Sequence, residues 1–151
     1  MKISIIGTGN MGKALAARLA GAVDLTVAGR DRAAVSAFAE TLDGVGAAGI
    51  DEAIVSADIV VLALPYSAAL ELAGNAVLNG KIIVDMSNPV APDFSGLTLG
   101  HTSSAGEEIA RQAVGARVVK AFNTIFAQVF DTPRSATASV PVFVAGDDAS
   151  A

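Results

Sequence analysis

The amino-acid sequence predicts an α/β fold: a doubly wound, mainly parallel sheet with helices on both faces. Three observations lead to this prediction. The strand candidates are continuous apolar runs, helical segments separate them, and a glycine-rich turn follows the first run. Continuous runs are typical of strands buried on both sides between two helix layers. They are Lys2 to Ile6, Asp24 to Ala28, Ile59 to Leu64, Lys81 to Met86, Arg117 to Ala121 and Pro141 to Ala145, with Gly44 to Ala48 as a shorter candidate.

The segments between these runs show helical periodicity. From Asn10 to Leu19, apolar residues recur every four positions, as on one face of an amphipathic helix. The segment from Asp31 to Leu42 shows a similar stripe, and Asp31 can cap it. The other predicted helices are Asp51 to Ser56, Ser67 to Leu78, Ser104 to Val114 and Asn123 to Phe130. Because strands and helices alternate, we expect right-handed crossovers and ligands beyond the carboxyl ends of the strands.

Length and composition exclude several classes of function. The 151 residues suffice for one domain, and the net charge of -5 argues against a nucleic-acid-binding surface. The chain has no cysteine and one histidine, His101, so we expect no metal centre. The longest apolar run, Ile59 to Pro65, is too short for a membrane helix, and strand character begins at Lys2, which leaves no room for an export signal. We therefore expect a cytoplasmic protein.

The glycine-rich turn, with the sequence Gly7-Thr8-Gly9-Asn10-Met11-Gly12, is the most informative motif. It follows a predicted strand, precedes a predicted helix and lies in a βαβ unit of the expected length, which is the context of a Rossmann-type dinucleotide site. Gly7 permits the tight turn, Gly9 lets the backbone approach a pyrophosphate, and Gly12 lets helix and strand pack closely. The alternative is a strand-to-helix connection that holds no ligand.

The end of the second strand indicates which nicotinamide cofactor is bound. Folds specific for NAD place an acidic residue there to accept from the ribose 2'-hydroxyl, but this chain has Gly29-Arg30-Asp31-Arg32. Arg30 can pair with a 2'-phosphate and Arg32 can add positive charge, so we expect NADP rather than NAD. Asp31 is more simply a helix cap. The alternative for both arginines is a solvated surface position.

Further polar residues follow the later strands. Asn88, held by the next residue Pro89, can anchor the nicotinamide ribose or carboxamide. Tyr66, beside Pro65, either covers a cofactor or packs in the core. Asn123 either contacts the cofactor or caps a helix. Asp85 could touch a substrate, but we favour hydrogen bonds to neighbouring backbone amides. His101 could contact a second coenzyme, but we favour a surface position.

Five blocks of the sequence resemble one known family. They are Gly7 to Lys13, Ala28 to Arg30, Lys81 to Pro89, Val118 to Thr124 and Pro141 to Asp148. In this order they are similar to the NADP oxidoreductases that use the deazaflavin coenzyme F420, and to the NADPH-binding domain of the STEAP metalloreductases.

The resemblance implies hydride transfer between NADP(H) and coenzyme F420 or another flavin, without a dedicated catalytic side chain. By position, Thr8 and Arg30 would hold the 2'-phosphate, the turn from Gly9 to Met11 the pyrophosphate, and Leu64 with Pro65 would line the crevice. The remaining implied contacts, near the nicotinamide, are Asn88, Pro89, Ala121, Phe122 and Asn123.

Two departures from the family qualify this expectation. Gly29 stands where relatives commonly carry a hydroxyl residue, and the sequence ends at Ala151, where relatives continue with helices. We therefore expect residues 1–151 to form a single NADP-binding Rossmann domain without that helical segment, with a homodimer as one form of self-association. The alternatives are a non-catalytic NADPH-binding module and a reductase of another small substrate, such as a ferric chelate or an imine.

Overall fold

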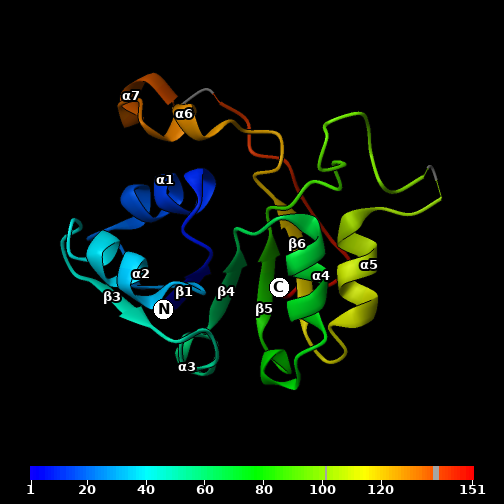
Figure 1. Ribbon diagram of the computed structural model, residues 1–151, viewed down its shortest axis with the longest axis horizontal. Helices are drawn as coiled ribbons and strands as arrows, with labels where there is room; N and C mark the ends of the chain where they lie inside the picture. The colour runs from blue at the N-terminus through cyan, green and yellow to red at the C-terminus, as the bar shows by residue number, and fades with distance from the viewer. Residues whose placement is uncertain (101, 138–139) are drawn as a thin grey trace.

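The structure is a computed structural model that describes residues 1–100, 102–137 and 140–151, and it confirms the predicted architecture (Figure 1). Within these residues, one sheet has the strand order β3-β2-β1-β4-β5-β6-β7. The strands are β1 (Lys2–Ile6), β2 (Asp24–Ala28), β3 (Val45–Ala48), β4 (Ile59–Leu62), β5 (Ile82–Asp85), β6 (Arg117–Ala121) and β7 (Val144–Gly146). All neighbours pair in parallel except β6 and β7, which are antiparallel.

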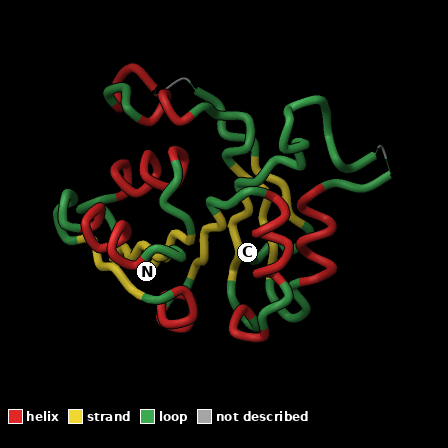
Figure 2. Tube along the Cα trace, in the orientation of Figure 1, coloured by secondary structure: helices red, strands yellow, loops and turns green. Residues whose placement is uncertain are grey.

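The helices connect the strands and cover both faces of the sheet (Figure 2). They are α1 (Asn10–Leu19), α2 (Arg32–Ala39), α3 (Ile50–Ser56), α4 (Tyr66–Ala73), the short 3-10 helix η1 (Ala76–Leu78), α5 (Ala105–Gln112), α6 (Ala127–Phe130) and α7 (Arg134–Thr137). One buried cluster joins α3, α4 and α5 to the sheet through residues such as Ile54, Ala69 and Ile109. A second cluster joins α1 and α2 to the opposite face through Leu15 and Val35.

The strand order creates a topological switch point between β1 and β4. From β1 the chain moves outward through β2 to β3, and it then returns to place β4 on the other side of β1. The connections that leave β1 and β4 therefore diverge to opposite sides, and an open α/β sheet binds its ligand in the crevice between them. The glycine turn after β1 lies at this point.

Two predicted helices differ from the observed ones. The predicted helix from Ser67 to Leu78 is divided into α4 and η1, with Asn75 capping η1 through Val77 N. The predicted helix from Asn123 to Phe130 begins only at Ala127. Phe122 has a φ of 63°, outside helical geometry, and it begins a turn in which Ile125 N donates to Phe122 O at 3.1 Å. The N-cap residue of α6 is Phe126, so Asn123 is not a helix cap.

The Asp31 cap predicted from the sequence is confirmed. Its carboxylate accepts from Ala34 N at 3.0 Å at the start of α2. We expect Asp31→Ala to lower the free energy of unfolding by about 1 kcal/mol, because α2 then loses its side-chain cap. Asp31→Asn keeps an acceptor oxygen and is expected to cost less. Urea denaturation of both variants measures this, and equal losses would contradict the assignment.

Candidate functional site

The three turn glycines have different surroundings. Gly7 has a φ of 109°, and a Cβ there would lie 2.3 Å from Ala63 O. A Cβ at Gly12 would lie 1.9 Å from Gly7 O, so this glycine allows α1 to begin directly against the turn. A Cβ at Gly9 would meet no atom within 4 Å. Gly7 and Gly12 are thus required by packing, whereas the space beside Gly9 is open to a ligand.

The start of α1 faces this open space without a side-chain cap. Its N-cap residue is Gly9, which offers no side-chain acceptor, and no acidic residue lies in the first turn. Asn10 is exposed and Met11 half-buried at the first two helical positions. The backbone N–H groups of such a turn and the positive pole of the helix are suited to an anion such as a pyrophosphate.

A cleft of about 900 Å³ runs from the glycine turn toward the end of β2. It brings together many of the residues predicted from the sequence: Gly7, Thr8, Gly9, Gly29, Arg30, Leu64 and Pro65. These residues follow β1, β2 and β4, so the switch point collects them from three separate parts of the chain. The volume lies near the upper end of the ~300–1,000 Å³ range typical of small-molecule sites.

The two predicted arginines have different positions. Arg30 lines the cleft, is exposed, and has no hydrogen bond or ion pair with the residues that the structure describes. Thr8 lies beside Gly29, the residue that precedes Arg30, since a Cβ at Gly29 would lie 3.8 Å from Thr8 Oγ1. Arg32 does not line the cleft: its guanidinium lies beside Gly49, where a Cβ would be 3.0 Å from Arg32 Nη1. Arg30 is therefore the better placed of the two for a ligand phosphate.

One wall of this cleft was not predicted from the sequence. The residues are Ser67, Ala68, Glu71, Leu72 and Asn75, of which the first four belong to α4. Their spacing of one, three, one and three positions places them on one face of a helix. That pattern could have been recognised, because the helix that follows β4 must border the crevice at the switch point.

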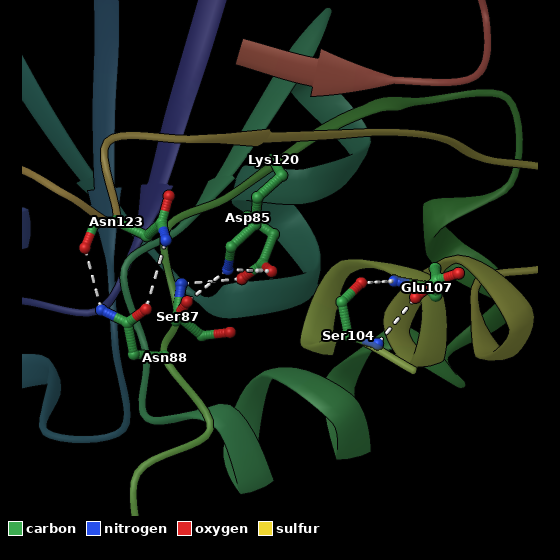
Figure 3. Close-up of polar contacts among 7 residues, drawn as sticks. All are labelled: Asp85, Ser87, Asn88, Ser104, Glu107, Lys120 and Asn123. Carbon is green, nitrogen blue, oxygen red and sulfur yellow. Dashed lines mark hydrogen bonds and ion pairs between the residues drawn. The ribbon is translucent and has the colours of Figure 1, made fainter. Parts of the chain in front are cut away.

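The second half of the site lies at the ends of β5 and β6, where two asparagines hold each other (Figure 3). Asn88 Nδ2 donates to the backbone oxygen of Asn123 at 3.0 Å, and Asn123 Nδ2 donates to Asn88 Oδ1 at 3.3 Å. Both residues were predicted to lie near the nicotinamide. The pair fixes the two loops to each other, 35 positions apart in sequence.

An ion pair joins the ends of the same two strands, β5 and β6. Lys120 Nζ donates to Asp85 Oδ2 at 2.7 Å and to the backbone oxygen of Ser87 (Figure 3). Asp85 is fully buried, and Asp85 Oδ1 accepts from Ser87 N at 2.8 Å, which confirms the predicted bond to a backbone amide. The pairing with Lys120 was not predicted from the sequence. The parallel register of β5 and β6 creates it by placing Asp85 opposite Lys120.

The other predicted residues near this half occupy mixed positions. Pro89 is half-buried beside Asn88, whereas the side chain of Ala121 is buried in the sheet. Tyr66 is half-buried at the start of α4 and packs against the core rather than lining the cleft. Burial, followed by the charges of Glu108 and Asp85, raises the pKa of the Tyr66 hydroxyl. His101 lies outside the described residues.

The described part of the chain holds no group of three or more His, Cys, Asp or Glu residues arranged for a metal ion. No helix within it is long and apolar enough to cross a membrane.

The fold and the glycine-turn cleft are those of a dinucleotide-binding α/β domain. A family model described as "NADP oxidoreductase coenzyme F420-dependent" matches residues 2–89. The chain belongs to this family and is an NADP-binding oxidoreductase domain.

Two solved structures resemble nearly the whole chain. A candidate F420-dependent NADP-reductase from Arthrobacter sp. FB24 is 35% identical with a TM-score of 0.84, over 99% of this chain and 75% of that one. A hypothetical protein from Sinorhizobium meliloti is 33% identical with a TM-score of 0.87, over the same shares of the two chains.

Metalloreductase STEAP3 of Rattus norvegicus is 33% identical over 130 residues, which cover 83% of this chain. The matched region is 25% of the rat protein, so this chain corresponds to only a quarter of that relative.

Proposed function

We propose that this chain binds NADP(H) and that a hydride passes between NADP(H) and a flavin-like acceptor, of which coenzyme F420 fits best. The observation that carries the proposal is the single cleft that joins the open glycine turn to Arg30. The glycine turn is suited to the pyrophosphate of a dinucleotide, and the guanidinium one strand away is suited to the 2'-phosphate, which distinguishes NADP(H) from NAD(H). The family description and the Arthrobacter relative support F420 as the acceptor.

The residues present fit this cofactor. The pyrophosphate would lie in the open space at Gly9, against the uncapped start of α1. The other residues that shape this turn are Gly7, Asn10, Met11 and Gly12. Thr8, Gly29 and Arg30 would surround the 2'-phosphate, with Arg32 adding charge from beside Gly49. Leu64 and Pro65 would line the crevice, and Tyr66 would support it from the start of α4. Asn88, Pro89, Ala121 and Asn123 would border the nicotinamide.

The chemistry requires little from protein side chains. The bound nicotinamide supplies the hydride, and the protein contributes distance, orientation and exclusion of water. We therefore propose no catalytic side chain within the cofactor cleft and a single NADP-binding Rossmann domain over residues 1–151. The similarity to metalloreductase STEAP3 favours ferric chelate as a second acceptor class.

A comparison of acceptors tests the proposal. NADPH is mixed with the protein and with F420, FMN, FAD or a ferric chelate, and its oxidation is followed by absorbance. We expect the fastest turnover with F420. Turnover with ferric chelate alone would favour the second acceptor class. Tight NADPH binding without turnover on any acceptor would overturn the enzymatic proposal in favour of a binding module.

A variant at Gly9 tests the cofactor site directly. Gly9→Ala places a methyl group in the open space, so we expect nearly unchanged stability and an NADPH dissociation constant raised by about tenfold, or ~1.4 kcal/mol. Fluorescence titration and thermal unfolding measure the two quantities. Gly96→Ala, another position where a Cβ meets no atom within 4 Å, is the matched control. Equal affinities of both variants for NADPH would contradict pyrophosphate binding at Gly9.

A further inference from the structure

A second, smaller cavity lies at the ends of β5 and β6, beside the proposed nicotinamide end of the site. Its volume is about 290 Å³, and it shares no lining residue with the cofactor cleft. Asn88, Asn123 and Lys120 form its polar wall, and Pro89, Leu97 and Leu99 form its apolar wall. Since small-molecule sites typically begin near ~300 Å³, the cavity holds part of a coenzyme-sized ligand rather than all of it.

Lys120 lines this cavity with a side chain that is anchored at both its stem and its ammonium group. Its stem packs on the start of α5, where a Cβ at Gly106 would lie 3.7 Å from Lys120 Cβ and Cδ. Two of the three ammonium hydrogens are engaged by Asp85 Oδ2 and Ser87 O. The third has no acceptor among the residues that the structure describes, while the side chain is 20% exposed and lines the cavity.

The surrounding charges favour a neutral ligand group over a free anion. Asp85 neutralises Lys120 from a fully buried position. Glu107 and Glu108 lie in the first turn of α5, next to the cavity wall formed by Ser104 and Gly106. Arg111 pairs with Glu108 and donates to Ser103, so among the described residues Glu107 is left as the unpaired charge of this turn. The Ser104 and Ser103 hydrogen bonds lower the pKa of Glu107 and Glu108 respectively, so both carboxylates stay ionised. A planar ring with an apolar body and a carbonyl edge matches this combination.

We propose that the cavity receives the carbonyl-bearing ring edge of the flavin-like acceptor, with Lys120 Nζ donating to a ring carbonyl oxygen. This inference rests on the proposed function for the class of acceptor. When the hydride leaves C4 of NADPH with both electrons of its C–H bond and bonds to the ring, the ring gains one negative charge. That charge spreads to the carbonyl edge until water supplies a proton. A donor held in place by Asp85 and Ser87 stabilises it without reorganisation.

The test is a binding measurement that needs neither NADPH nor turnover. Riboflavin and the deazaflavin chromophore of F420, both without phosphate groups, are titrated into ¹⁵N-labelled protein. We expect shifts at the Gly106 backbone amide and at the side-chain amides of Asn88 and Asn123. The single variant Asp85→Asn keeps Lys120 as a donor and should still bind. Adding Lys120→Met to it, which leaves no unpaired buried charge, should weaken binding by about tenfold or more.

The possible outcomes separate this inference from the proposed function. Shifts at the three named groups, together with weaker binding by the double variant than by Asp85→Asn, would support the ring-edge site. Equal binding by the two variants, shifts confined to the glycine-turn cleft, or no binding of either ring would overturn it. A parallel NADPH titration is followed at the backbone amides of Thr8 and Gly9, which line the cofactor cleft and not the second cavity. Its failure would count against the proposed function and leave the ring titration interpretable.

Discussion

Arg30→Ala is expected to weaken NADPH binding by about 10- to 150-fold and to leave NADH binding nearly unchanged. This range corresponds to the ~1.5–3 kcal/mol that hydrogen bonds to a charged group contribute. Arg30 lines the cleft and has no partner among the described residues, so its guanidinium is available to a phosphate. Only NADPH carries the 2'-phosphate. Fluorescence titrations with both reduced cofactors, at one salt concentration, measure the selectivity.

Arg32→Ala is the matched control for this experiment. It removes the same charge two positions away, but the Arg32 side chain lies beside Gly49 and outside the lining of the cleft. We expect a loss of NADPH affinity of threefold or less, about the size of a screened surface charge effect. Equal losses in the two variants would show that net charge, rather than contact with Arg30, sets the affinity. If Arg30→Ala lost equal affinity for NADH and NADPH, this result would contradict the proposed contact between Arg30 and the 2'-phosphate.

Most of the fold could be predicted because its signals are local. Continuous apolar runs mark the strands, and the bounds of β1, β2 and β6 agree with the sequence expectation. The predicted strand from Pro141 to Ala145 is observed only as Val144–Gly146, and this edge strand is exposed rather than buried on both faces. The errors occur where tertiary geometry overrides local pattern. A turn from Phe122 to Ile125 replaces the start of the helix predicted from Asn123, and α6 begins at Ala127. The four-residue α7 was not predicted, since so short a segment carries almost no periodic signal.

The candidate site was predictable where a motif coincides with a strand end. Thr8, Arg30 and Leu64 each follow a strand, and parallel strands bring their carboxyl ends to one edge, so the cleft assembles as the sequence suggests. The pairing of Asp85 with Lys120 was not predictable in this way. It depends on the register of two strands separated by a long loop and a helix, and a single sequence carries no signal for that register.

Lys120→Met is expected to lower the free energy of unfolding by about 3–5 kcal/mol, because it leaves the fully buried Asp85 carboxylate without its cation. For a domain of this size the loss corresponds to a melting temperature lower by about 6–20 °C. Asp85 would retain only the hydrogen bond from Ser87 N. Thermal and urea unfolding measure the change.

The double variant Asp85→Asn with Lys120→Met distinguishes an unpaired charge from lost packing. It removes both charges and keeps an oxygen that can accept from Ser87 N, so it should recover most of the stability that Lys120→Met loses. No recovery would mean that the Lys120 stem against Gly106, rather than the ion pair, stabilises this edge of the sheet. A loss of about 1 kcal/mol or less in the single variant would show that solvent screens the pair as it does at a protein surface. Recovery up to the stability of the unchanged protein would show that the unpaired charge causes the loss. A double variant more stable than the unchanged protein would show that the pair is kept at a stability cost, as expected of a lysine held in place for a ligand.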